Sequence, residues 1–206
     1  RWDEFMYYAG IAETIGVKVN KLTPKQLKEL WPLCEIDGVL GAIQHPDDGY
    51  IQPADLTQSL AKGARSRGAE IYRNTTVTAL EQLPSGEWLV KTDKGDIACE
   101  HVVSCSGNFA RKTGAMVGLD IPVIPVEHQY IVTEPSPLIK ERQAKGLPEM
   151  GVLREADSSW YLREENGGFV LGIYEKGAPC CYVDGPSEQS EYELFQGELD
   201  RLEPYI

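Results

Sequence analysis

The sequence lacks the groups that most metal and nucleic-acid sites require. Its 206 residues include only three histidines, His45, His101 and His128, and their spacing matches no metal-ligand motif. The formal net charge is −12, and no large cluster of lysine and arginine interrupts the acidic background. Nucleic acids and anionic membrane surfaces attract basic patches, so we expect neither as a partner. Solubility is a sufficient explanation of the acidity.

Long apolar runs and recognisable leader segments are also missing. No run is long enough to cross a membrane, so we expect no membrane insertion. The cysteines are odd in number, and Cys180 and Cys181 are adjacent, which suits neither a metal knuckle nor a simple bridge. Reduced, buried or incidental thiols are the expected state, and they favour a cytoplasmic location, with the mitochondrial matrix as the alternative. The start at Arg1, already helix-like and without Met, indicates a piece of a longer protein.

Local signals predict four helices. Apolar positions at helical spacing predict the first, from Arg1 to Gly16. A Thr-Pro-Lys-Gln run forms a capping box at Thr23 and starts a short helix that ends near Trp31. A third helix is expected from Pro53 to Arg67, where an internal Gly63 would allow close approach to a sheet. The fourth is expected at 188–202.

Alternating apolar runs bounded by turn residues predict the strands. Between the helices we expect a strand and loop at 38–49 and strands at 69–72, 76–83, 87–92, 96–99 and 101–105; later strands are expected at 121–134, 151–154, 159–163 and 169–174. The run Glu165-Asn166-Gly167-Gly168 predicts a tight hairpin turn. Helices followed by an antiparallel excursion and a return strand predict an α/β (α+β) fold.

The stretch His101 to Thr133 contains the strongest hints of chemistry. Its first apolar run breaks on Ser106-Gly107 before a helix-like segment, and such a break lets backbone approach a ligand. An ordinary strand-to-helix turn would look the same. His128 lies inside the second apolar run, where it is either an acid/base or carboxylate-binding group or a structural histidine. Tyr161 is either a half-buried aromatic or a hydroxyl that orients a substrate.

Several blocks along the chain together resemble one family. These blocks are Asp48 to Leu56, Ala61 to Ala69, Cys105-Ser106-Gly107, Pro125 to Tyr130, Tyr161 to Glu164 and Gly172 to Glu175. Their order resembles the FAD-dependent amine oxidoreductases of the D-amino-acid oxidase superfamily, and within it the dimethylglycine and sarcosine dehydrogenases. The resemblance is collinear and covers nearly the whole chain.

The resemblance implies two interleaved domains. Residues 48–118 would form part of a glutathione-reductase-like FAD-binding domain, and residues 1–47 and 119–206 part of a substrate domain with a mixed or antiparallel sheet. The backbone of Val77 would meet the adenine, while Ser106 and Gly107 would border the FAD. His128 and Tyr161 match the substrate-site His and Tyr of the family. The parent protein would oxidise a small N-methyl amino acid, and tetrahydrofolate is a possible second cofactor.

The chain departs from the family pattern in one respect that bears on activity. No Gly-x-Gly-x-x-Gly turn, which holds the FAD pyrophosphate, occurs in the sequence. We therefore expect the chain alone neither to hold FAD tightly nor to turn over substrate. Two other interpretations remain: a non-catalytic relative that binds a metabolite or a partner, and a flavoenzyme for a glycerol phosphate. The second would need several phosphate-binding arginines, and only Arg154 and Arg163 are obvious candidates.

Overall fold

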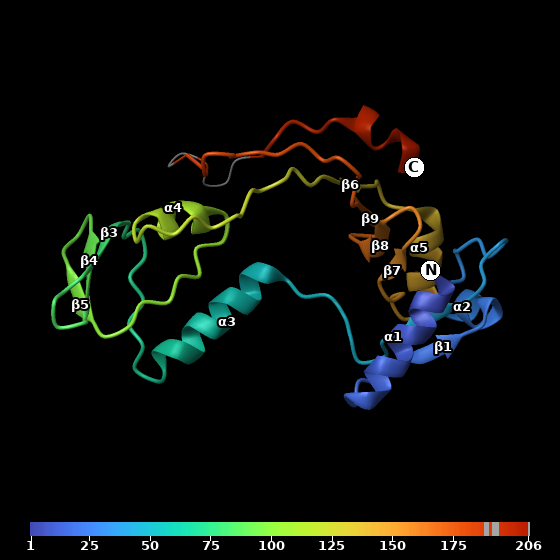
Figure 1. Cartoon of the computed structure of the whole chain (residues 1–206). Helices are drawn as coiled ribbons and strands as arrows, with labels where there is room; N and C mark the ends of the chain where they lie inside the picture. Colours follow the sequence, from blue (N-terminus) through green and yellow to red (C-terminus); the bar gives the residue numbers. More distant parts are fainter. Residues whose placement is uncertain (188–189, 191–193, 206) are drawn as a thin grey trace. The chain divides into compact units, whose positions relative to one another are not determined.

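A computed structural model describes residues 1–187, 190 and 194–205. The chain forms two compact units, each assembled from separated segments (Figure 1). Unit 1 comprises Arg1–Ile51, His128–Gly177 and Gly197–Ile206, and unit 2 comprises Gln52–Glu127 and Ala178–Gln196. These limits are not those of the domains predicted from the resemblance, and the roles of those domains stay a prediction.

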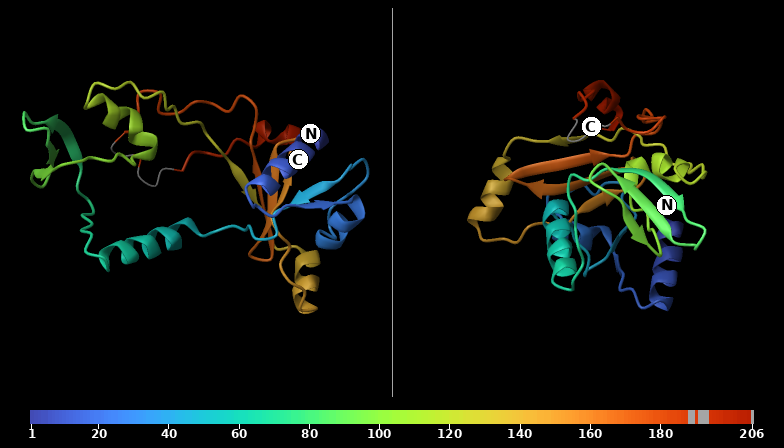
Figure 2. Two further views of the ribbon diagram at one scale, coloured as in Figure 1. Left: turned by 60° about the horizontal axis from the view of Figure 1, so that its bottom comes forward. Right: turned by 90° about the vertical axis from the view of Figure 1, so that its left-hand side faces the viewer.

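Unit 1 is built around a four-stranded antiparallel sheet of order β6-β9-β8-β7. Its strands are β6 (Tyr130–Val132), β7 (Leu153–Glu155), β8 (Trp160–Glu165) and β9 (Gly168–Ile173). Both views of Figure 2 show the orange strands β8 and β9 side by side. The predicted hairpin turn between them is confirmed: Asn166 and Gly167 have φ of 49° and 79°, as a two-residue turn of type I′ requires.

Five further α-helices and β-strands belong to unit 1, and the two strands among them pair in a small antiparallel ladder. They are α1 (Trp2–Thr14), α2 (Pro24–Leu30), the pair β1 (Asn20–Leu22) and β2 (Ala42–Gln44), and α5 (Pro137–Ala144). The capping box predicted at Thr23 is present, because its hydroxyl accepts the Gln26 N–H and the Gln26 side chain accepts the Thr23 N–H at 2.8 Å. The helix α5 was not predicted.

One face of the four-stranded sheet carries the hydrophobic core. Leu27 and Trp31, from α2 and its end, pack with Ile139 of α5 and Met150, and the sheet contributes Leu153, Leu162 and Phe169. Two hydrogen bonds also connect the residues of this cluster to neighbouring residues. The indole N–H of Trp31 donates to the Gly151 carbonyl at 2.7 Å, and the buried Glu164 carboxylate accepts the Met150 N–H at 2.9 Å. Because neighbouring strand residues face opposite sides, Tyr161 and Arg163 lie on the other face.

Unit 2 contains a meander and two larger helical segments. Its elements are α3 (Pro53–Arg65), the antiparallel sheet β3 (Val77–Gln82), β4 (Trp88–Thr92) and β5 (Ile97–Cys99), the 3-10 turn η1 (Gly107–Phe109) and α4 (Ala110–Ala115). The predicted meander strands at 76–99 are therefore confirmed to within two residues. No residue of α3 is buried, and a Cβ at Gly63 would meet only the Arg67 side chain, so the expected close approach to a sheet is wrong.

Three strand predictions were wrong in whole or in part. Residues 69–72 and 101–105 form no strand, and the run 121–134 shortens to β6 and one isolated bridge between Val126 and Cys180. An apolar run becomes a strand only where a neighbour pairs with its backbone, and the described residues provide none for these segments. In the fourth predicted helix, residues 188, 189 and 191–193 lie outside the described residues. The rest contains only the short turn η2 (Leu199–Arg201), followed by η3 (Glu203–Tyr205).

Candidate active site on the open face of the sheet

A row of aligned residues crosses the open face of the unit 1 sheet. Tyr130 of β6 pairs with Gly172 of β9, Gly172 with Tyr161 of β8, and Tyr161 with Arg154 of β7. The Arg154 guanidinium lies 5.7 Å from the centre of the Tyr161 ring, within cation–π range. A phenol and a cation therefore stand next to each other at the middle of the sheet.

The Tyr161 ring occupies the space that a side chain at Gly172 of β9 would need. A Cβ built on Gly172 would come within 2.0 Å of Cζ and 2.3 Å of the hydroxyl oxygen of Tyr161. No real side chain tolerates such contacts. The absence of a side chain at Gly172 thus determines where the Tyr161 hydroxyl can be.

His128 joins this row from just outside the ladder. The register of β6 and β9, continued two residues beyond the Tyr130–Gly172 pair, sets His128 opposite Tyr174 on the same face. The two rings are stacked, with centroids 5.1 Å apart and planes at 18°. The Tyr161 ring lies 6.5 Å from that of His128 and 5.8 Å from that of Tyr174. The structure therefore brings the two predicted substrate-site residues, His128 and Tyr161, together around a third aromatic ring.

The environment of Tyr161 keeps its phenol protonated. Burial raises the pKa of Tyr161, the nearby Tyr174 adds to this, and the cations Arg163 and Arg154 oppose it. A phenol whose pKa is raised above its ordinary value, near 10, remains a hydrogen-bond donor throughout the neutral range. Such a donor can bind an anionic group such as a carboxylate.

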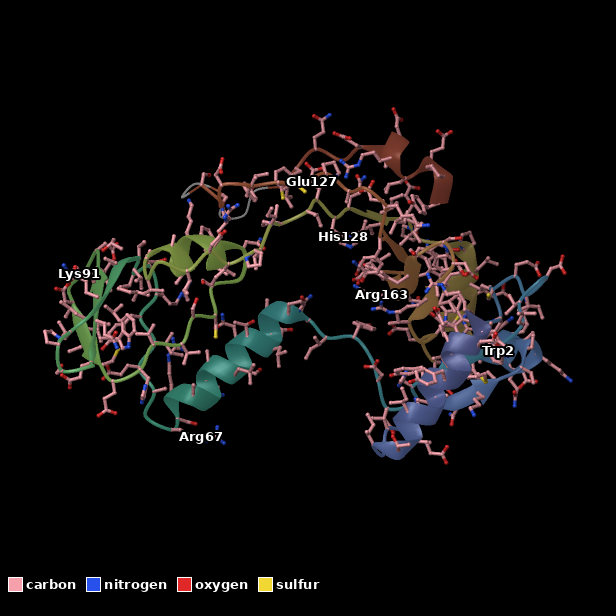
Figure 3. All side chains as sticks on the ribbon, in the orientation of Figure 1. Trp2, Arg67, Lys91, Glu127, His128 and Arg163 are labelled. Carbon is pink, nitrogen blue, oxygen red and sulfur yellow. The ribbon has the colours of Figure 1, made fainter. Side chains whose placement is uncertain are left out.

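A pocket of about 340 Å³ opens beside this row. Tyr130, Tyr161 and Arg163 line it together with Val132 and Val170. Figure 3 shows Arg163 and His128 beside the strands of this sheet. Glu165 and Asn166 complete the lining, so the pocket combines apolar and polar side chains, and its volume is in the range typical of small-molecule sites.

The positive charge of Arg163 is already engaged. Its guanidinium donates to the carboxylate of Glu165 and to the Glu164 carbonyl, and it lies 4.5 Å from the centre of the Tyr50 ring. The Tyr50 hydroxyl in turn donates to Glu149 at 2.9 Å. Arg163 therefore mainly lines the pocket. Arg154 is the arginine that is more available to bind a ligand.

The predicted cofactor residues lie in unit 2. Thr76 turns its backbone toward β4, since its carbonyl accepts the Asp93 N–H and its own N–H donates to the Asp93 carboxylate. Backbone groups of consecutive strand residues point to opposite sides, so those of Val77 face the edge of β3 that no described strand covers. An adenine edge could pair with this backbone.

Ser106 and Gly107 form the start of η1. Gly107 has φ of 53°, and a Cβ at this position would meet no atom within 4 Å. The Ser106 hydroxyl lies 2.8 Å from that of Ser104 and makes no capping bond to the turn. The exposed backbone at this turn fits a group that must approach closely, as expected for a cofactor edge. No hydrogen bond joins this turn to Val77 within the described part of the chain.

Other kinds of site find no support in the described residues. No three His, Cys, Asp or Glu side chains there are grouped to hold a metal ion. None of the described helices is long and apolar enough to cross a membrane. The five cysteines are free, and Cys105 and Cys180 are exposed rather than buried.

Comparison with known proteins identifies the family. The model of the FAD dependent oxidoreductase family matches residues 1–205, which is nearly the whole chain. The chain belongs to this family. It is 36% identical to the mitochondrial dimethylglycine dehydrogenase of Rattus norvegicus over an alignment that covers 100% of the chain and 24% of that protein. It is 35% identical to a formaldehyde-forming 4-methylaminobutanoate oxidase of Paenarthrobacter nicotinovorans, covering 99% of the chain and 24% of the oxidase.

The fold is also found among solved structures. The L-proline dehydrogenase of P. horikoshii superposes with a TM-score of 0.74 at 27% identity, over 98% of this chain and 50% of that one. The predicted fold class and family are thereby confirmed. The chain spans about a quarter of the length of the curated relatives it matches. By their names, these two relatives are a dehydrogenase of dimethylglycine and an oxidase of 4-methylaminobutanoate.

Three residues of the open face were not predicted to lie beside His128 and Tyr161: Arg154, which was named only as a candidate phosphate-binding arginine, and Gly172 and Tyr174, which were named only within a block that resembles the family. Strand periodicity could have found two of them, because Gly172 and Tyr174 are two residues apart in a predicted strand and must share a face. Their pairing with Tyr161 and His128 depends on the register between strands, which the sequence does not show directly.

Proposed function

We propose that the chain is part of a flavin-dependent oxidoreductase that oxidises a small N-methyl amino acid of the dimethylglycine or sarcosine type. The observation that carries the proposal is the cluster of Tyr161, His128 and Arg154 on one open sheet face. The cluster offers a neutral donor, an imidazole and a cation beside a small pocket. The names of the relatives, one acting on dimethylglycine and one on 4-methylaminobutanoate, support a methylated amine with a carboxylate.

The two units would divide the work. We assign cofactor binding to unit 2, with the Val77 backbone at the adenine and Ser106 and Gly107 along the FAD. Substrate binding belongs to unit 1. Unit 2 would hold FAD, which would supply the hydride acceptor for oxidation of the N-methyl carbon of the substrate. The protein's own residues bind and orient the amine.

Tyr161 and Arg154 would hold the substrate carboxylate. The phenol of Tyr161 stays protonated and donates one hydrogen bond, and Arg154 supplies the balancing charge. His128, stacked on Tyr174, would adjust the proton balance of the amine or pair with the carboxylate. A neutral amine is needed because its lone pair forms the C=N bond of the iminium as the hydride leaves.

The second cofactor, the electron acceptor and the location are inferred from the same class of flavin-dependent amine oxidoreductase. Tetrahydrofolate is a candidate acceptor for the carbon released from the iminium, and the electron acceptor stays undefined. The rat relative is a mitochondrial protein, which favours the mitochondrial matrix over the cytoplasmic location expected from the cysteines. A glycerol phosphate substrate is disfavoured because the charge of Arg163 is paired with Glu165. A non-catalytic binding role is disfavoured because both predicted polar side chains of the site are present.

The test uses the full-length enzyme that contains this chain. We expect His128→Ala to lower kcat/KM for sarcosine or dimethylglycine by about 100-fold, the lower end of the range for a proton-transfer group. Tyr161→Phe should raise KM by about tenfold, because the carboxylate loses one charge-assisted hydrogen bond. His45→Ala and Tyr7→Phe are the matched controls, since both lie in unit 1 and neither lies on the open sheet face. Unchanged turnover and affinity in both site variants would exclude the proposed site.

A second arm uses the 206-residue chain alone. Without a Gly-x-Gly-x-x-Gly turn it should elute from gel filtration colourless after incubation with FAD, with no flavin absorption band and no amine turnover. A yellow, flavin-loaded chain would show that these 206 residues bind FAD without such a turn and would contradict this expectation.

A further inference from the structure

The segment Gly197–Tyr205, here called the C-terminal segment, packs against the rest of unit 1 near the His128 end of the sheet. Leu202 is 1% exposed, and the Tyr205 hydroxyl accepts the Lys176 N–H at 3.0 Å just beyond β9. The segment is therefore anchored at its end by both apolar burial and a hydrogen bond.

A two-way amide contact holds the same segment to the residue after His128. The Gln129 side chain donates to the Glu198 carbonyl at 3.1 Å and accepts the Glu198 N–H at 3.0 Å. One side chain thus satisfies a backbone donor and a backbone acceptor, as a neighbouring strand would do. The contact fixes the chain at position 129, outside the ladder that begins at Tyr130.

An ion pair holds the residue after Tyr174. Arg201 donates from Nε to Glu175 Oε2 at 3.0 Å and from Nη2 to Oε1 at 2.7 Å. The Glu175 side chain is 7% exposed and that of Arg201 20%. Hydrogen bonding from Arg201 holds the pKa of Glu175 below its usual range, against the effect of burial. Two parallel bonds from a planar guanidinium fix orientation as well as distance.

These contacts bracket the stacked rings of the candidate site. Gln129 follows His128 and Glu175 follows Tyr174, so in extended backbone each anchor points away from the face that carries the rings. The β6–β9 ladder itself ends at Tyr130 and Gly172 and does not reach either ring-bearing residue. The Tyr174 N–H still donates to the Ser159 carbonyl at 2.8 Å, and the C-terminal segment adds the contacts that hold Gln129 and Glu175.

We propose that Arg201 and Gln129 are positioning residues, which set the stack of His128 on Tyr174 by anchoring Glu175 and the backbone at 129 to the C-terminal segment. The inference rests on the proposed function in that His128 serves the substrate there. Neither residue touches the open face, and both act through their neighbours in the sequence. Substitution should therefore change the geometry of His128 more than it changes the stability of unit 1.

The experiment records the ring-proton resonances of the three histidines in the 206-residue chain by NMR, with the His128 signal assigned from His128→Ala. Stacking on Tyr174 shifts the His128 signal upfield, and Tyr174→Leu marks its unstacked position. We expect Arg201→Met to move the His128 signal at least half of the way from its position in the unsubstituted chain to its position in Tyr174→Leu. Arg201→Lys, which keeps the charge, should move it less. Lys145→Met, which removes an exposed ion pair with Glu141 in the same unit, is the control and should leave the signal in place.

A folded Arg201→Met chain with an unmoved His128 signal overturns the proposal. If this variant does not give a dispersed spectrum, Gln129→Ala decides in its place by the same comparison. In the full-length enzyme, Arg201→Met should lower kcat/KM by about 10-fold to 100-fold, with Arg201→Lys recovering most of the loss. An unmodified enzyme without amine turnover would contradict the proposed function alone, since the NMR comparison still decides the positioning.

Discussion

The missing side chain of Gly172 gives the clearest residue-level test of the open face. Substitution by Ala would press a methyl group into the Tyr161 ring. We expect Gly172→Ala to lower the free energy of unfolding of unit 1 by about 1–3 kcal/mol, the usual cost of overpacking. In a Tyr161→Ala background the same substitution should cost much less, because the obstructing ring is gone. Urea unfolding of the four members of this cycle measures the coupling.

Gly151→Ala is the matched control. Gly151 is also a non-helical glycine of unit 1, yet a Cβ there would meet no atom within 4 Å. Its substitution should change the free energy of unfolding by less than about 0.5 kcal/mol. If Gly172→Ala lowered the free energy of unfolding equally with and without the Tyr161 ring, the cost would not come from contact between the new methyl group and that ring.

The residues of the candidate site were unequally accessible to sequence reasoning. His128 and Tyr161 could be named because they stand in blocks that resemble a family. Arg154 was named only as a candidate phosphate-binding arginine, and Tyr174 only within a family block. Neither could be placed beside Tyr161 or His128, because cross-strand pairing alone brings them there. A phenol's raised pKa likewise depends on burial by residues distant in the sequence.

At the scale of elements, caps and turns were predictable because their causes are local. The capping box at Thr23 and the turn at Asn166-Gly167 each involve four consecutive residues, and both formed as expected. The strands expected at 69–72 and 101–105 did not form, because a strand needs backbone partners that may come from anywhere in a protein. The helix α5 went unpredicted because no two of its apolar residues Leu138, Ile139 and Ala144 are three or four positions apart.

Thr23→Ala tests whether this local signal also stabilises the unit. The substitution removes the hydroxyl that accepts the Gln26 N–H at the start of α2, whose far end positions the buried Trp31. We expect a loss of about 1 kcal/mol in the free energy of unfolding, measured by urea titration. Lys25→Ala, an exposed change in the same helix, should have little effect. Equal effects of the two substitutions would show that the cap contributes nothing specific.

For the whole molecule, the hydrophobic core is unevenly divided. The nine buried hydrophobic residues of the described chain all lie in unit 1: Ala9, Ala12, Leu27, Trp31, Ile139, Met150, Val170, Ile173 and Leu202. In unit 2, α3 exposes Leu56 and Leu60, and Val103 is 83% exposed. Burial of apolar surface is the main force that offsets conformational entropy, so the two units should differ in stability.

We therefore expect unit 2 to unfold at a lower urea concentration than unit 1 in the 206-residue chain. Of the four tryptophans, Trp88 alone lies in unit 2, while Trp2, Trp31 and Trp160 lie in unit 1. A variant that keeps only Trp88 should show an early fluorescence transition, and Trp88→Phe should show the late one. Amide exchange should give the same order, with β3–β5 exchanging before β8 and β9. A single transition common to both reporters would mean that the two units unfold together. The number of buried hydrophobic residues in unit 2 would then not predict its stability.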